Sequence, residues 1–190
     1  MHTTMRPHRT LTRFILATVV VIAVGIPAGV HATPEPAGLV PDPARQPSFH
    51  RSQTSGTPVT TLRIPTISLD EVVRSGVSLD VIDRGVAHWA GTAEPGDEGN
   101  VVLAGHRTTH TRPFEDLDRV SVGDLVYLDD GSGFEVIYRV DKTFIVDPSD
   151  LWITYNRDRP SLTMFACHPK GSARYRIVVT AELLTGRKIA

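Results

Sequence analysis

The stretch SLTMFACHPKGSARYRIVV, residues 161–179, contains two apolar runs separated by a short polar loop. Cys167 stands at the end of the first run, and Pro169 and Gly171 follow it. Both runs are rich in β-branched and aromatic residues, which favour strands, whereas proline and glycine favour turns. The stretch therefore predicts two strands joined by a loop, with the only cysteine of the chain at a strand end that a ligand can reach.

Short strands of the same kind are expected along most of the remaining chain. Gly, Pro and Asp clusters separate runs rich in Val, Ile, Tyr, Phe and Thr. The expected strands lie at 59–65, 67–73, 100–106, 124–130, 133–140, 142–146, 161–167 and 175–183. Many short strands with turns between them predict an all-β domain, either a closed barrel or a sandwich.

Three connections between these strands carry their own local pattern. The segment DDGSG, 129–133, predicts a hairpin connection. Short helices are expected at 78–85, with Ser78 as the N-cap, and at 112–120, with Pro113 in the first turn. These helices are too brief to change the all-β assignment.

Length and charge narrow the class of protein. A chain of 190 residues with 41% hydrophobic residues is long enough for one domain with a real core. The formal net charge is −1, so the chain lacks the basic excess typical of nucleic-acid-binding proteins. We therefore expect no nucleic-acid partner.

The N-terminal region has the pattern of an export signal. Three arginines and no acidic residue precede the uncharged apolar stretch at 14–30. The stretch is close to the minimum length for crossing a bilayer, and it ends near Ala32 in a sequence that resembles a signal-peptidase site. Residues 1–32 are thus an uncleaved membrane anchor, which we favour, or a cleaved signal, and either one places the rest of the chain outside the cytoplasmic membrane.

A linker separates this segment from the folded domain. Residues 33–57 are rich in Pro, Ser, Thr and Gly and contain few large apolar side chains. Such a segment buries too little surface to offset the entropy lost on ordering. The organisation expected is therefore a signal or anchor at 1–32, a flexible linker at 33–57 and a catalytic or binding domain at 58–190.

The lone cysteine is the main indication of chemistry. Exported proteins usually pair their cysteines in disulfides, so an unpaired Cys167 is either a small buried hydrophobic residue or a reactive thiol. Its place at the junction of a strand and a loop favours a nucleophile.

A thiol nucleophile needs an acid or base partner, and His106 is the preferred candidate. It ends the apolar stretch NVVLAGH, 100–106, as Cys167 ends its own stretch, so two adjacent strands would place the two side chains together. Gly105 permits a close backbone approach at this point. His168 directly follows Cys167, and alternation along a strand would send the two side chains to opposite faces.

The segment HRTTH, 106–110, raises the question of a metal site, because it carries His106 and His110 four residues apart. The sequence shows no third ligand for them, and a protein zinc site needs at least three. We therefore expect no metal and no cofactor.

A developing oxyanion also needs a donor, and Arg174 and Arg176 are the candidates. They lie two residues apart in RYRIVVTAEL, so on a strand they share a face. A guanidinium supplies permanently charged donors that can hold a peptide carbonyl. Without a nearby cysteine and histidine, both would be read as solvated charges at a strand edge.

These residues occur in an order that resembles the sortases, the membrane-anchored cysteine transpeptidases of Gram-positive bacteria. The resemblance rests on LAGH, on FEDLDRVSVGD, and on a strand-ending cysteine followed nine residues later by arginine. IPTISLD, GTAEPGDEGNVVLAGHR and CHP are most similar to class E sortases of actinobacteria. The resemblance covers about 58–184 and implies a closed eight-stranded β-barrel with the triad His106, Cys167 and Arg176, with Arg174 as the second choice.

The sequence departs from the family at two positions beside the expected site. Ala166 stands where sortases usually carry threonine, and Trp89 stands where class E relatives are expected to carry a tyrosine associated with a preference for alanine over proline in the sorting signal. We take Trp89, Ala166 and Arg174 as candidate substrate-binding residues. The departures leave both an LAXTG and an LPXTG signal open.

The resemblance also implies the reaction and the partners. Sortases cleave a C-terminal sorting signal between Thr and Gly and join the protein to an amine of the cell wall. The expected partners are surface proteins that carry such signals, a peptidoglycan precursor amine and the cytoplasmic membrane, and a monomer is expected.

Two other functions are compatible with an exported chain that has one thiol. The first is a different exported cysteine peptidase or an L,D-transpeptidase, although TMFA before Cys167 differs from the glycine-flanked pattern of those enzymes. The second is an anchored binding barrel without catalytic activity, in which Cys167 only packs in the core. Alkylation of the folded protein separates a reactive thiol from a packed one.

Overall fold

The computed structural model describes residues 55–129 and 132–188, and these residues form a closed barrel of eight strands. The predicted eight-stranded all-β barrel is therefore confirmed, and the sandwich is excluded. The strands are β1 (Pro58–Ile64), β2 (Leu69–Ser75), β3 (Val86–His88), β4 (Asn100–Ala104), β5 (Leu125–Asp129), β6 (Phe134–Val146), β7 (Ser161–His168) and β8 (Tyr175–Lys188).

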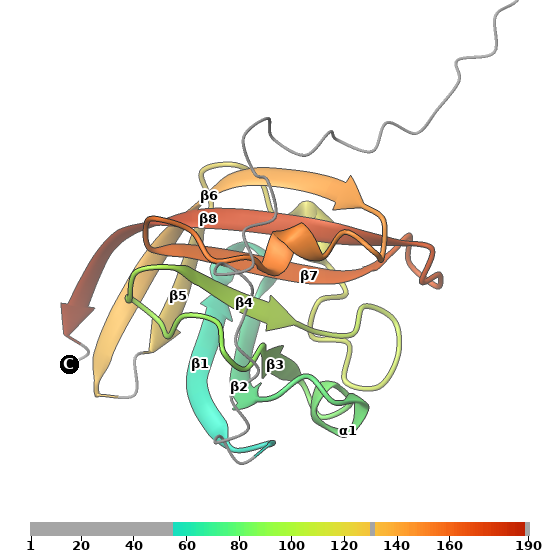
Figure 1. The fold of residues 1–190 in the computed structure, drawn as a ribbon, viewed down its shortest axis with the longest axis horizontal. Coiled ribbons are helices and arrows are strands. Elements are labelled where there is room, and N and C mark those ends of the chain that lie inside the picture. The colour runs from blue at the N-terminus through green and yellow to red at the C-terminus, as the bar shows by residue number, and fades with distance from the viewer. Residues whose placement is uncertain (1–54, 130–131, 189–190) are drawn as a thin grey trace, which may run out of the picture. The chain divides into compact units, whose positions relative to one another are not determined.

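The order of strands around the barrel brings distant parts of the chain together. The order is β1-β2-β3-β4-β7-β8-β6-β5, and β1 pairs with β5 to close the barrel. The β2–β3 and β4–β7 pairs are parallel, whereas the other pairs are antiparallel. Figure 1 shows β4 beside β7, with β8 returning antiparallel to β7. Three strands that are separated in sequence thus reach the same end of the barrel.

The barrel interior is filled by one apolar cluster to which all eight strands contribute. On β4, β7 and β8, the fully buried interior side chains include Leu103, Met164 and Val179. Successive side chains on a strand point to opposite faces. The alternate positions of these strands therefore face outward, where they can form a site without disturbing the core.

The strand count agrees with the sequence for two compensating reasons. The predicted strands at 133–140 and 142–146 are a single strand, β6, with an irregularity in its pairing with β8 between Val140 and Lys142. A bulge of this kind bends a strand without ending it. The sequence reading missed β3, because three residues are too short to show a periodic pattern, although all three are buried.

The helices are shorter than expected. The helix expected at 78–85 is the single turn α1 (Leu79–Ile82), with Ser78 at the N-cap position. The helix expected at 112–120 is wrong: only the 3₁₀ turn η3 (Leu117–Arg119) forms there, and Pro113 precedes it. The backbone N–H of Phe114 donates instead to the carbonyl of His106 at 3.1 Å, which ties this segment to the end of β4.

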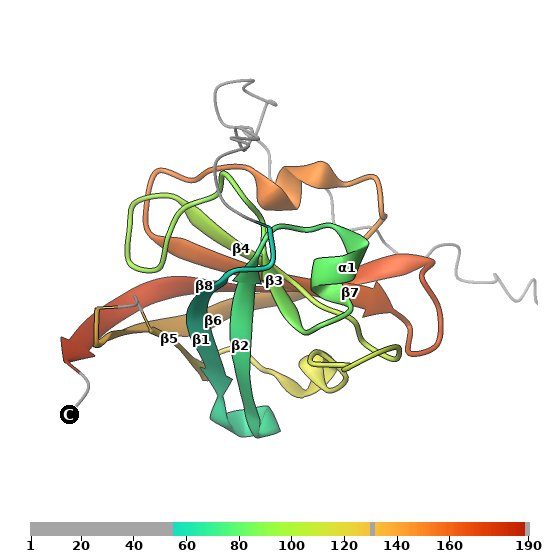
Figure 2. The ribbon, with the colours of Figure 1, turned by 90° about the horizontal axis from the view of Figure 1, so that it is seen from below.

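Two further 3₁₀ turns complete the described structure, namely η2 (Pro65–Ile67) and η4 (Leu151–Thr154). Figure 2 shows η4 in the connection between β6 and β7. Antiparallel pairing of β5 and β6 agrees with the expected hairpin at 129–133, although residues 130 and 131 are outside the described residues.

The predicted export segment at 1–32 and most of the linker at 33–57 lie outside the described residues. Within the ranges that the structure describes, no helix has the length and apolar character needed to span a membrane. The expected anchor and the domain boundaries stay predictions.

Candidate active site

The pairing of β4 with β7 brings His106 toward Cys167. The two strands run parallel in a constant register that ends with Ala104 opposite Phe165. The backbone N–H of Gly105 then donates to the carbonyl of Phe165 at 3.3 Å, which extends the ladder beyond β4. Continued by two residues, the same register would set His106 beside Cys167.

The pairing of β7 with β8 places Arg176 on the other side of the cysteine. Cys167 is directly opposite Arg176 in this antiparallel pair, and directly opposed Cβ atoms lie about 4.5–5.5 Å apart. Arg174 precedes β8 and is exposed, and its guanidinium lies 5.2 Å from the Tyr175 ring. The structure therefore aligns Arg176, and not Arg174, with Cys167.

All three side chains are on the outer face of the barrel. The interior cluster takes Leu103 on β4, Ala166 on β7 and Ile177 on β8, so the neighbouring alternate positions point outward. Cys167 is half-buried. His106, Cys167 and Arg176 thus form a row across three adjacent strand ends, with the cysteine in the middle.

The same alternation corrects one candidate substrate residue. Ala166 is 2% exposed and belongs to the interior cluster, so its side chain faces away from the row. A side-chain contact with a substrate on the outer face is therefore excluded for Ala166. The missing hydroxyl at this position changes the packing of the core and not the lining of the site.

The guanidinium of Arg176 is held by the backbone of the β7–β8 connection. Nη1 donates to the carbonyl of Ala173 at 3.0 Å and to the carbonyl of Tyr175 at 2.9 Å. A guanidinium has five N–H donors, so donors other than those on Nη1 can serve a ligand. The contacts orient the side chain and leave it able to bind a peptide carbonyl.

His106 is held by a residue that the sequence reading missed. Its Nε2 lies 2.8 Å from Oδ1 of Asp83, the C-cap residue of α1. Gly105 is required just before it, because a Cβ there would lie 2.8 Å from a Phe114 ring carbon. Nothing in the sequence pairs Asp83 with His106, since the two meet only when α1 packs near the end of β4.

A second histidine, His110, also approaches the carboxylate of Asp83, from the loop after β4. His110 Nδ1 lies 3.3 Å from Asp83 Oδ1, and the His106 and His110 rings stack with centroids 4.7 Å apart. The sequence reading rejected a metal site for want of a third ligand near these histidines. Asp83 supplies a third group close to both histidines, which the sequence did not show.

His168 points away from the row, as the alternation predicted. Its Nδ1 accepts a hydrogen bond from Nη1 of Arg107 at 2.7 Å. Arg107 is 2% exposed and also pairs with Asp118 at 2.8 Å, so it ties the loop after β4 to the end of β7. Burial lowers the pKa of His168, and the charge of Arg107 lowers it further, whereas Asp118 raises it. The sequence reading also missed Arg107, although its charge next to His106 was visible.

An aromatic pair continues the outer face from Cys167 toward β3. The Trp89 and Phe165 ring centroids are 6.0 Å apart, and Trp89 follows β3 directly. The indole Nε1 of Trp89 is buried without a hydrogen-bond partner among the described residues. An unpaired buried donor is costly.

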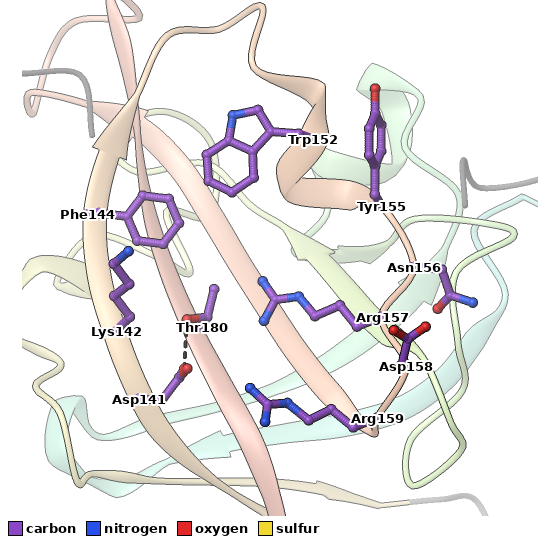
Figure 3. Close-up of a pocket in the computed structure, with 10 residues that line it drawn as sticks. All are labelled: Asp141, Lys142, Phe144, Trp152, Tyr155, Asn156, Arg157, Asp158, Arg159 and Thr180. Atoms are coloured by element: carbon purple, nitrogen blue, oxygen red, sulfur yellow. Dashed lines mark hydrogen bonds between the residues drawn. The ribbon is translucent and has the colours of Figure 1, made fainter. Parts of the chain in front are cut away.

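A separate cavity of about 560 Å³ lies farther along the outer face, between β6, β8 and the chain that follows η4. Figure 3 shows Arg157 and Arg159 reaching from that chain toward the strands that carry Asp141 and Thr180. The Phe144 and Trp152 rings stack at its edge, with centroids 5.7 Å apart. Burial lowers the pKa of Arg157, and the charge of Asp141 raises it.

Comparison with known proteins identifies the family. The model of the Sortase domain matches residues 62–184, which is more than half of the chain and includes the whole row. The chain belongs to the sortase family. Sortases are cysteine transpeptidases, so the family has the chemistry expected of a thiol between a histidine and an arginine.

Individual relatives agree with this assignment. The chain is 31% identical over 128 residues to Sortase D of Bacillus subtilis (strain 168), with coverage of 65% of this chain and 63% of that protein. It is 28% identical to Sortase SrtE1 of Streptomyces coelicolor, covering 66% of this chain and 40% of that protein. The chain thus spans less than two thirds of the length of these relatives.

The fold agrees with a solved sortase. The structure of sortase E from Streptomyces avermitilis is similar with a TM-score of 0.64 and 30% identity, covering 72% of this chain and 93% of that chain. The relatives include both sortase D and sortase E, so they establish the family without separating the classes.

Proposed function

We propose that this chain is a sortase of class E type that cleaves a C-terminal sorting signal between Thr and Gly and transfers the protein to a cell-wall amine. The observation that carries the proposal is the alignment of Cys167 between His106 and Arg176 on the outer face. Acyl transfer by a thiol requires a nucleophile, an acid and an oxyanion donor. Each of these three groups comes from a different strand end.

The first half of the reaction forms a thioester. The thiolate of Cys167 attacks the carbonyl carbon of the threonine, and the carbonyl oxygen becomes an oxyanion that accepts hydrogen bonds from Arg176. The carbon–nitrogen bond of the Thr-Gly peptide then breaks, and His106 gives a proton to the departing glycine amine. The acyl group remains on the sulfur of Cys167.

The second half returns the enzyme to its starting state. The acceptor amine attacks the thioester carbon, and His106 takes a proton from the attacking nitrogen. The carbon–sulfur bond breaks and releases the Cys167 thiolate. The products are a new amide and the free enzyme, so no oxidant, reductant or cofactor is consumed.

The peptide substrate lies along the outer face from Cys167 toward Trp89. Phe165 lies two residues before Cys167 on the same face, and its ring contacts Trp89. An extended peptide along this face would lie against the Trp89–Phe165 pair. The indole of Trp89 discriminates between LAXTG and LPXTG peptides, because it occupies more space than the phenol of the tyrosine expected in class E relatives.

The partners and location follow from the same assignment. The donor substrates are surface proteins with C-terminal sorting signals, and the acceptor is an amine of a peptidoglycan precursor. We place the domain outside the cytoplasmic membrane, tethered through residues 1–32 and the linker at 33–57. Arg174, which is exposed next to β8, contacts the substrate or acceptor only at the edge of the site.

The test uses the full chain with matched LAXTG and LPXTG reporter peptides and a small amine acceptor, and products are detected by mass spectrometry. We expect cleavage between Thr and Gly, capture of the threonine by the amine, and loss of both in Cys167→Ala. A thioester trapped on Cys167 in the absence of amine would identify the intermediate directly.

Two results would overturn parts of the proposal. If neither peptide is cleaved and Cys167 in the folded protein resists a small alkylating agent, the thiol is a packing residue and the domain is a binding barrel. If the thiol reacts but neither peptide is cleaved, the nucleophile is correct and the substrate class is wrong.

A further inference from the structure

We propose that Asp83, His106 and His110 form a binding site for a divalent transition-metal ion such as Zn²⁺. The three residues come from two segments: Asp83 caps α1, and His106 and His110 both lie in the loop that follows β4. One ligand atom from each lies within 4.8 Å of the other two. The structure thus assembles a site that the sequence does not show as a motif.

The distances are close to those of a zinc site. Zinc lies about 2.0–2.2 Å from imidazole nitrogen and carboxylate oxygen, so tetrahedral ligand atoms are about 3.3 Å apart. The separation of His110 Nδ1 from Asp83 Oδ1 is 3.3 Å, and that of His106 Nε2 from Asp83 Oδ1 is 2.8 Å. Of these two pairs, the second must open by about half an ångström for an ion to enter, and the ligand nitrogens of the two histidines lie within 4.8 Å of each other.

The ligand types select the class of ion. Two imidazoles and one carboxylate suit Zn²⁺ and its neighbours among the transition metals, whereas Mg²⁺ and Ca²⁺ prefer oxygen ligands throughout. His110 is 49% exposed and Asp83 is 36% exposed, so an ion can enter from solvent and keep water as a fourth ligand. Such an open position is typical of a reversible site and not of a structural zinc site.

Occupancy of this site would inhibit the enzyme, and this part of the inference rests on the proposed function. A metal on Nε2 of His106 removes that nitrogen from proton transfer and holds the ring toward Asp83. The thiol of Cys167 is not among the three ligands, so alkylation of the thiol should continue while the metal is bound. Metal binding and acyl transfer would then be mutually exclusive at one histidine.

The binding test compares the full chain with His110→Asn and Asp83→Asn by isothermal titration with ZnCl₂ after treatment with a chelator. Asparagine is chosen at position 110 because the residue has φ of 53°, a left-handed conformation that asparagine tolerates. We expect each variant to weaken zinc binding at least about tenfold, since each loses one of three ligands. Mg²⁺ should produce no comparable binding.

Two control variants make the comparison specific. His8→Asn carries the same substitution in the N-terminal segment and should leave the affinity of this site unchanged. Cys167→Ala should also retain it, because the sulfur is not a ligand in the proposal. Equal zinc affinity in the wild type and His110→Asn, or loss of binding in Cys167→Ala with retention in His110→Asn, would overturn the proposal.

The inhibition test keeps the two proposals separate. For each protein, the rate of peptide transfer with Zn²⁺ is divided by its rate with a chelator. This ratio should be at least about tenfold lower in the wild type than in His110→Asn. If the peptides are not cleaved but the binding pattern holds, the proposed function fails and the metal site stands. If cleavage occurs and zinc affinity is the same in all variants, the metal site fails and the proposed function stands.

Discussion

Two regions on the outer face of β8 lie four residues apart and differ in almost every property. At Arg176, the three adjacent strand ends present a thiol, an imidazole and a guanidinium in a row. At Thr180, a cavity of about 560 Å³ is lined by aromatic and charged side chains but holds no thiol or histidine. The separation along the strand is about 13 Å.

The difference arises from how each region is built. The cavity lies between β6, β8 and the chain after η4, and side chains such as Trp152 and Arg157 line it. The reactive row forms from strand register, which backbone hydrogen bonds hold fixed. This cavity and the reactive row therefore do not coincide, because volume and reactivity have different structural causes.

The largest effect is expected from removing the acid. His106→Gln should lower kcat/KM for peptide transfer by about 10³-fold, since general acid–base catalysis contributes about 10²–10⁴-fold. His168→Gln is the matched control, because His168 lies next to Cys167 in sequence but bonds to Arg107 away from the row. Equal loss in the two variants would mean that the row on the outer face is not the catalytic unit.

The next effect separates the two arginines. Arg176→Lys should lower kcat by about 10²-fold, because lysine cannot reproduce the planar donors that face an oxyanion. Arg174→Lys should change kcat by less than about twofold, because Arg174 is exposed and precedes β8. Steady-state kinetics with one reporter peptide measures both, and a reversed order would contradict the register of β7 and β8.

A smaller effect tests the cavity. Arg157→Gln should change the rate of peptide transfer by less than about twofold, because Arg157 lies in the cavity and not in the row. The same reporter assay, with circular dichroism to confirm folding, measures this variant. A tenfold or greater loss of the transfer rate in a folded variant would show that the peptide site extends to the cavity.

The smallest effect is on stability as a function of pH. Burial and Arg107 lower the folded-state pKa of His168 below its unfolded value of about 6.5, so its contribution is present above that value and is lost as the pH falls below it. The Tm of the wild type should therefore fall more between about pH 7.5 and pH 5 than that of His168→Gln. The corresponding difference in the free energy of unfolding should stay below about 1 kcal/mol, because the His168 ring is partly exposed to solvent.

Thermal denaturation of the two proteins over this pH range measures the difference. Glutamine keeps an acceptor for Arg107 and removes only the titration. A variant whose Tm falls as steeply as that of the wild type would show that other groups cause the loss of stability in acid.

The sequence was most informative where strands are long and most misleading where packing overrides local pattern. The apolar runs that became β4, β7 and β8 were visible from composition alone. The three-residue β3 was not visible, and the helix expected at 112–120 did not form, because Phe114 is drawn into the core beside the end of β4. A propensity of a few tenths of a kcal/mol per residue is easily outweighed by burial of one aromatic side chain.

For the site, the residues that end apolar strands could be found in the sequence: His106 and Cys167 are where buried runs give way to loops, and this is a local property of the chain. Three features required the folded structure: Arg176 rather than Arg174 is opposite Cys167, Ala166 faces the core, and Asp83 reaches His106. Register sets the first two of these, because a shift of one residue moves every side chain to the other face. The third depends on the packing of a single helical turn near the end of β4, and no periodicity in the sequence records a contact of that kind.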